Sequence, residues 1–153
     1  MMSAPALRLA TPDDVETLAD AWYAMLEEDG LLASNVDPHW RSYITADFRA
    51  GISAGSQVWV VAEEQGRIVA TGAAFIRGGR STMALTGLTA IIAGVYTFPP
   101  YRRRGVARSI VGRLIEISRT RGCRAIRLRA SAQGRPLYEQ LGFVNGDEMV
   151  LAL

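Results

Sequence analysis

The most informative stretch of the chain is a turn rich in arginine, where residues 95–108 read VYTFPPYRRRGVAR. The β-branched and aromatic residues at its start are typical of a strand, which we expect over residues 90–97. Pro99 and Pro100 end that strand, because proline has no N–H to donate to a neighbouring strand. From Arg103 onward, apolar residues recur three and four positions apart, which predicts an amphipathic helix.

The turn between this strand and this helix has the chemistry of an anion-binding site. The first N–H groups of a helix have no partner inside the helix and carry partial positive charge, so they bind phosphate readily. Gly105 has no side chain to keep an anion at a distance, and small Ala107 keeps the first helical turn open. The stretch matches neither a GxGxxG nor a GxxxxGK motif. A solvated arginine run and a nucleic-acid contact are the alternatives that these residues leave open.

The rest of the chain predicts an α/β arrangement. Residues 82–90 fit either a loop or an irregular strand, after a break at residues 78–81. Start signals and helical spacing predict four helices, at residues 12–30, 37–55, 103–122 and 135–142. Alternating or β-branched runs predict strands at residues 7–10, 58–63, 68–76, 90–97, 125–130, 143–144 and 148–153.

Length and composition are those of one globular domain spanning residues 1–153. The chain is 49% hydrophobic and 21% charged, which excludes a wholly disordered protein. No apolar run reaches the roughly 18 residues that cross a bilayer, and the first residues lack the pattern of a secretory signal. The single cysteine, Cys123, offers neither an internal disulfide nor a metal-binding pair. We therefore expect a cytoplasmic protein without a metal.

The charges divide the chain into two unlike parts. All 17 cationic side chains are arginine, which excludes a lysine base or a lysine Schiff base. Residues 1–64 hold three arginines against eleven acidic residues, a net charge of −8, whereas residues 65–153 hold 14 against four, a net charge of +10. An acidic part and a basic part can serve ligands of opposite charge.

A second stretch, at residues 130–143, reads ASAQGRPLYEQLGF. Together the two stretches resemble the GNAT superfamily of acetyl-CoA-dependent N-acetyltransferases. Residues 102–107, RRRGVA, resemble its R/Q-x-x-G-x-G/A motif, and LYEQLGF resembles the helix that follows one helix and one strand later. The resemblance covers nearly the whole chain. It implies a central mixed, mostly antiparallel twisted sheet of about six or seven strands, flanked by about four helices.

The resemblance also implies roles for individual residues. The strand before the motif splays from its neighbour and offers backbone groups to pantetheine, and the N–H groups of residues 103–108 hold the pyrophosphate. Tyr138 matches the tyrosine that protonates the departing CoA thiolate. Ser131 stands where many relatives carry asparagine, and Ala107 replaces the last glycine of the motif. The implied cofactor-binding residues are Val95, Tyr96, Thr97, Arg102, Arg103, Arg104, Gly105, Val106, Ala107, Arg108 and Ser131.

The chemistry of acetyl transfer can be argued separately. An amine with a pKa of about 10 must lose a proton before it attacks, whereas a thiol with a pKa of about 8.5 leaves with the help of a weak acid such as tyrosine. The thioester carbonyl is usually polarised by a backbone N–H, which a bulged strand can supply. Glu27, Glu28 and Asp29 are candidates for the base and for binding the acceptor, and a base that acts through water is the alternative. His39 and the thiol of Cys123 are weaker candidates for chemistry.

The sequence therefore predicts an enzyme that moves the acetyl group of acetyl-CoA to a primary amine by direct attack in a ternary complex. The acceptor is a small molecule or a peptide, with a positive charge expected from the acidic part of the chain. A GNAT domain that binds CoA as a sensor or interaction module is the alternative. We expect no nucleic-acid or membrane partner, and the sequence leaves open whether the chain forms a homodimer.

Overall fold

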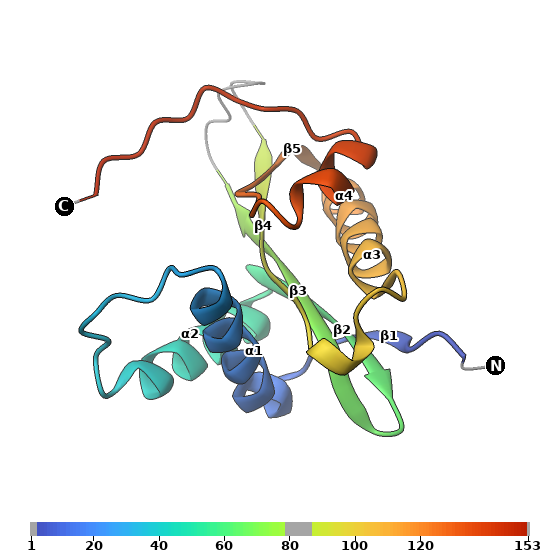
Figure 1. The fold of residues 1–153 in the computed structure, drawn as a ribbon. Coiled ribbons are helices and arrows are strands. Elements are labelled where there is room, and N and C mark those ends of the chain that lie inside the picture. The colour runs from blue at the N-terminus through green and yellow to red at the C-terminus, as the bar shows by residue number, and fades with distance from the viewer. Residues whose placement is uncertain (1–2, 79–86, 153) are drawn as a thin grey trace.

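The computed structural model describes residues 3–78 and 87–152, which form one sheet with helices on both faces (Figure 1). A 3-10 turn, Pro12–Asp14, precedes the first helix, and a second, Pro99–Tyr101, follows the fourth strand. The described elements are β1 (Ala6–Leu9), α1 (Val15–Glu28), α2 (Trp40–Ala54), β2 (Gln57–Glu64), β3 (Arg67–Arg77), β4 (Leu88–Thr97), α3 (Val106–Thr120), β5 (Cys123–Leu128) and α4 (Arg135–Gln140).

The strands lie in the sheet in the order in which they follow along the chain, from β1 to β5. Neighbours pair antiparallel except for β4 and β5, which are parallel. Parallel neighbours need a crossover, and α3 supplies it. This mixed, mostly antiparallel sheet confirms the predicted fold class, and the four α-helices of the described residues match the expected number.

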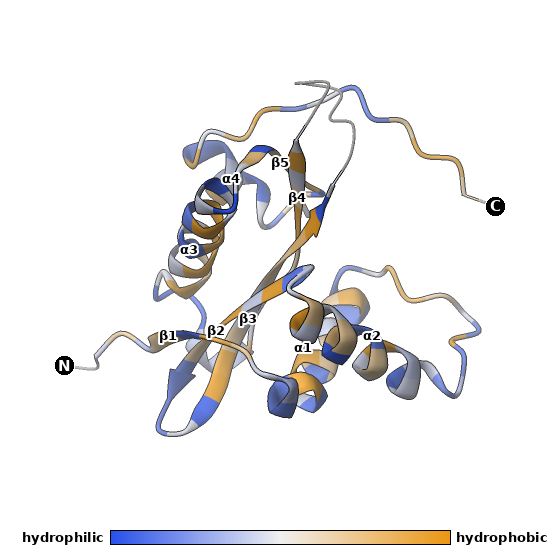
Figure 2. Ribbon diagram, turned by 180° about the vertical axis from the view of Figure 1, so that it is seen from behind, coloured by the Kyte–Doolittle hydropathy of each residue, from blue (hydrophilic) through white to orange (hydrophobic). Residues whose placement is uncertain are grey.

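Each face of the sheet has its own apolar core, because side chains of a strand alternate between the two faces. Helices α1 and α2 cover one face, where Phe48 and Leu18 pack on Trp59 and Val61 of β2. Helix α3 covers the other face with Ile110, Val111 and Leu114, packed against Val60, Ala62, Val69, Ala74 and Ile92. Figure 2 shows the hydrophobic colour gathered between the sheet and these helices, with α3 and α4 on the side opposite α1 and α2.

The predicted C-terminal strands are wrong for the residues that the structure describes. The chain beyond α4 runs away from the sheet without strand pairing, and Val144 and Met149 are 91% and 95% exposed (Figure 1). β-branched residues favour a strand only where a partner strand and a packed face stabilise it. The sheet over residues 3–78 and 87–152 therefore has five strands, fewer than the six or seven expected.

The prediction for residues 82–90, a loop or an irregular strand, is resolved only in part. Strand β4 begins at Leu88, so the end of the ambiguous stretch at residues 82–90 is strand, whereas residues 82–86 lie outside the described part. Residues 79–81 and Leu153 lie outside it too.

Of the helices in the described part, none is long and apolar enough to cross a membrane.

Candidate active site

The turn before α3 has two residues in the left-handed backbone region. Gly105 is the N-cap of α3, with φ of +73°, and Arg103 has φ of +64°. Left-handed geometry at a residue with a Cβ costs about 1–2 kcal/mol, so the surrounding fold holds Arg103 in a conformation that arginine does not favour. A Cβ built on Gly105 would meet no atom within 4 Å. The space beside Gly105 at the start of α3 is therefore open, and the first N–H groups of a helix have no partner inside the helix.

The arginines of the turn point in different directions. Arg102 donates from Nη2 to both carboxylate oxygens of Glu28, at 2.8 and 3.0 Å, and from Nε to the Thr97 carbonyl at 2.8 Å. Arg104 lies 3.5 Å from a Glu64 oxygen and stacks over the Tyr101 ring.

Only Arg103 of the three has no hydrogen-bond or ion-pair partner among the described residues. An anion at this turn would therefore meet mainly backbone N–H groups and Arg103.

Strand β4 carries a bulge directly before the turn. Its register with β3 runs from Thr71 opposite Tyr96 to Ala73 opposite Ala93, so Gly94 and Val95 together oppose one residue of β3. A bulge leaves one residue unpaired and bends the strand. The sequence expectation of a bulged strand that can supply a backbone N–H is in keeping with this register.

The same part of β4 does not pair with β5, its neighbour on the other side. Pairing between β4 and β5 ends at Ile92 opposite Leu128, so among the described strands none lies against residues 93–97 on the β5 side. The two strands therefore part at this point, which agrees with the splay that the resemblance implied. Backbone groups of Val95 and Thr97 stand at this edge, although the Thr97 carbonyl already accepts the bond from Arg102.

Two glycines allow the bulge to be packed from both faces, and the sequence argument did not identify them. A Cβ on Gly94, whose φ is +66°, would lie 3.0–3.1 Å from Trp59 and Trp22 on the α1 face. A Cβ on Gly72 of β3 would lie 2.6 Å from Ile110 on the α3 face. A glycine inside an apolar strand is a recognised signal of a bulge or a close backbone approach, and it could have indicated Gly94.

Tyr138 lies on α4, half-buried against the α3 core, with its ring edge-on to Phe143 at 5.9 Å. Burial raises the pKa of its hydroxyl above the usual value of 10.0, and the negative charge of Asp29 raises that pKa further. The hydroxyl therefore keeps its proton at neutral pH, as a general acid must. The influence of Asp29 brings the end of α1 and α4 into one electrostatic environment.

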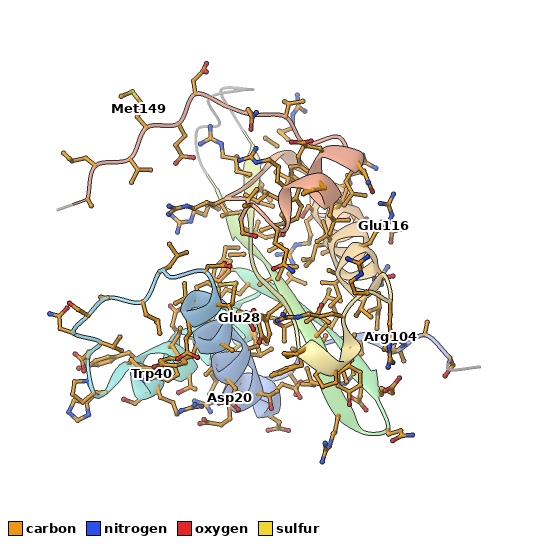
Figure 3. The ribbon with its side chains drawn as sticks, viewed as in Figure 1. Asp20, Glu28, Trp40, Arg104, Glu116 and Met149 are labelled. Carbon is orange, nitrogen blue, oxygen red and sulfur yellow. The ribbon has the colours of Figure 1, made fainter. Side chains whose placement is uncertain are left out.

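The three acidic candidates at the end of α1 are not equivalent. Glu28 accepts from Arg102 and from the Tyr96 hydroxyl, at 3.1 Å, and Figure 3 shows it on the side of α1 that faces the motif turn. Glu27 and Asp29 are exposed and have no ion-pair partner in the described part of the chain. Glu28 is thus occupied as a link between α1 and the turn, whereas the other two carboxylates are free to meet a ligand.

Several other candidate residues have local structural roles. Ser131 accepts a bond from the Gly134 N–H at 3.1 Å, at the start of α4. Val106 is 5% exposed and belongs to the α3 core, so only its backbone is available to a ligand. Arg108 donates to Gln140 of α4 at 2.9 Å. His39 is the exposed N-cap residue of α2, and burial raises the pKa of the Cys123 thiol, which disfavours a reactive thiolate.

The fold and the site combine a helix N-terminus behind a left-handed turn with a bulged strand that parts from its neighbour. Residues 19–143 match the model of the acetyltransferase (GNAT) family. The chain therefore belongs to the acetyltransferase (GNAT) family. That membership confirms the predicted family and the predicted enzyme class.

A curated relative and solved structures agree with this assignment. Glucosamine 6-phosphate N-acetyltransferase of Trypanosoma brucei brucei is 38% identical over 69 residues, which span 45% of this chain and 42% of that protein, less than half of each. A predicted acetyltransferase from Clostridium acetobutylicum, solved with acetyl-CoA, has a TM-score of 0.87 and 28% identity over 97% of this chain and 95% of that one. A GCN5-related N-acetyltransferase from Ralstonia eutropha JMP134 shares the fold, with a TM-score of 0.80 and 23% identity over 97% of each chain.

Proposed function

We propose that the chain transfers the acetyl group of acetyl-CoA to a primary amine by direct attack in a ternary complex. The observation that carries the proposal is the juxtaposition of two backbone features at the ends of one short segment. The β4 bulge at Gly94 and Val95 leaves backbone groups on an open strand edge, and the left-handed turn at Gly105 opens a helix N-terminus. The C. acetobutylicum relative, which was solved with acetyl-CoA, supports this choice of ligand.

The residues present fit acetyl-CoA by their chemistry. The N–H groups of residues 103–108 would hold the pyrophosphate, in the space that is empty beside Gly105. The open edge of β4, where backbone groups of Val95 and Thr97 stand, would pair with the amide groups of pantetheine. Bound there, acetyl-CoA supplies an activated acyl group in its thioester.

Residues of the chain then assist each part of the transfer. The acceptor amine gives a proton to Glu27 or Asp29, directly or through water, and then attacks the thioester carbonyl. The Val95 N–H stabilises the oxygen that becomes negative. When the carbon–sulfur bond breaks, Tyr138 donates its proton to the thiolate. Glu27 and Asp29 attract a cationic acceptor and orient its amine.

A binding measurement and a rate measurement together test the proposal. Acetyl-CoA at 100 times its Kd should stabilise the fold by about 2.7 kcal/mol, whereas NADH should not. Release of free thiol is then followed with a polyamine, an aminoglycoside, a peptide with a free N-terminus and glucosamine 6-phosphate. Turnover that is fastest with a cationic amine supports the proposal. Binding of acetyl-CoA without turnover on any acceptor would support the sensor alternative, and no binding at all would overturn both.

A further inference from the structure

One buried side chain makes a bond to the β4 bulge from the neighbouring strand. Thr71 of β3 is 1% exposed, and its hydroxyl donates to the Gly94 carbonyl at 2.8 Å. That carbonyl belongs to the residue with φ of +66°, where the regular ladder of the sheet is interrupted. The hydroxyl therefore takes the place of a backbone donor that the bulge has removed.

The geometry of the peptide bond makes this contact relevant to the chemistry. The Gly94 carbonyl and the Val95 N–H belong to one planar trans peptide, so the two groups point in opposite directions. A Gly94 carbonyl held by Thr71 turns the Val95 N–H away from β3. The side of β4 away from β3 is the one that β5 has left after Ile92.

Packing and a hydrogen bond act on the bulge together. Trp22 and Trp59 press on one face at Gly94, and Ile110 presses on the other face at Gly72. These contacts hold the backbone in place, and a buried carbonyl also needs a hydrogen-bond donor, which further limits rotation of its peptide plane. The Thr71 hydroxyl is such a bond, and it is shielded from competing water.

We propose that Thr71 is a positioning residue for acetyl transfer, whose hydroxyl fixes the Gly94–Val95 peptide and so aims the Val95 N–H at the thioester oxygen. The inference rests on the proposed function, because it needs a thioester at this edge of β4. Thr71 acts through the peptide and does not touch the reacting atoms.

Two substitutions at one position separate the hydroxyl from the shape of the side chain. Thr71→Val keeps the volume and removes the donor, and Thr71→Ser keeps the donor. We expect Thr71→Val to lower kcat about tenfold or more, with the KM for acetyl-CoA changed less than threefold, because a donor misplaced by a fraction of an ångström loses much of its effect. Thr71→Ser should recover most of kcat.

A matched control measures what loss of any buried threonine hydroxyl does to the protein. Thr45 of α2 is 6% exposed and donates to the Arg41 carbonyl at 2.8 Å, so Thr45→Val makes the same chemical change elsewhere. It should lower the Tm while leaving kcat near that of the wild type. All rates are measured well below the lowest Tm of the series.

An infrared spectrum of bound acetyl-CoA, labelled with ¹³C at the carbonyl, provides a readout that a purely structural role would not move. Polarisation by the Val95 N–H lowers the carbonyl stretching frequency, so Thr71→Val should return it toward the value in solution and Thr71→Ser should not. Wild-type kcat or an unmoved frequency in Thr71→Val would overturn the inference, as would a failure of Thr71→Ser to restore kcat. A wild-type chain that binds no acetyl-CoA would instead overturn the proposed function, and this inference with it.

Discussion

The turn before α3 and the end of α1 face each other with opposite formal charges, but they differ in how many of their charged side chains are paired. In the turn, Arg102 and Arg104 are paired with Glu28 and Glu64, so the proposed anion site would be built largely from backbone N–H groups. At the end of α1, Glu27 and Asp29 keep carboxylates without an ion-pair partner among the described residues. The pairing of each side chain, rather than the net charge of its half, therefore indicates which charges a ligand can meet.

The largest expected effect tests the backbone character of the turn. Gly105→Asp places a carboxylate beside the pyrophosphate site, and like charges there should weaken acetyl-CoA binding by about 100-fold or more. Gly105→Asn is the matched control, because asparagine has nearly the same shape and both residues tolerate left-handed geometry. Titration calorimetry with CoA measures both, and circular dichroism checks the fold. A larger loss from Arg103→Ala than from Gly105→Asp would show that a side chain, not the backbone, dominates the site.

The next effect concerns Tyr138, the proposed proton donor. Tyr138→Phe keeps the ring packed and removes the hydroxyl, so kcat should fall by about 100-fold while the Kd for acetyl-CoA stays unchanged. Turnover assays with the best acceptor measure kcat, and calorimetry measures the Kd for acetyl-CoA. Full turnover in Tyr138→Phe would mean that water protonates the thiolate.

The raised pKa of Tyr138 also sets the pH dependence. The acid form is required, so the Tyr138-dependent rate should hold through neutral pH and fall only above pH of about 10, and this falling limb should be missing in Tyr138→Phe. The free energy of unfolding should also fall at high pH. Because the folded state raises the pKa of Tyr138, the unfolded chain loses this proton first as the pH rises. The contribution of Tyr138 to the free energy of unfolding is therefore complete below pH of about 10 and is lost as the pH rises through the raised pKa of the folded state.

A smaller effect tests the free carboxylates at the end of α1. Asp29→Asn and Glu27→Gln should each lower kcat/KM for a cationic acceptor several-fold at low salt and flatten its fall with ionic strength. Asp13→Asn, the same change of charge before the start of α1, should do neither. The comparison breaks if the best acceptor is neutral or anionic and its kinetics do not depend on salt.

The smallest effect concerns the link between the two regions. A double-mutant cycle on Glu28 and Arg102 should give a coupling free energy of about 0.5–1 kcal/mol, because both side chains are only partly exposed. The Arg113–Glu116 pair, exposed on α3, is the matched control and should give about 0.3 kcal/mol or less. Urea unfolding measures both cycles. Equal coupling free energies for the two pairs would show that the Glu28–Arg102 ion pair does not stabilise the contact between α1 and the turn.

Much of the fold could be predicted because its signals are local. The helix after the turn follows from the spacing of Val106, Ile110 and Leu114. It begins at Val106 and not at Arg103 as predicted, because Arg103 and Gly105 have left-handed backbone geometry. The hairpin of β2 and β3 follows from two β-rich runs around a short turn at Gly66. Each of these signals depends on residues within a few positions of one another, so no knowledge of the tertiary structure was needed.

The remaining features depend on contacts between distant segments. Thr71 meets Gly94 across a shifted strand register, and Glu28 meets Arg102 over 74 positions of sequence, so neither partner could be predicted from a local pattern. Acidity alone therefore could not separate Glu28 from Glu27 and Asp29. The C-terminal strands were expected from β propensity, which does not stabilise a strand without a partner.

The tryptophans packed on the β4 bulge also offer an intrinsic fluorescence probe of the candidate site. Two of the three indoles, Trp22 and Trp59, lie against Gly94, whereas Trp40 lies on α2 and stacks on Tyr23. Replacing Trp40 by phenylalanine would leave the fluorescence of the chain to the pair beside the bulge. A ligand that binds beside the Gly94–Val95 peptide should then change the emission of this pair, so the kinetics of binding can be followed without a label.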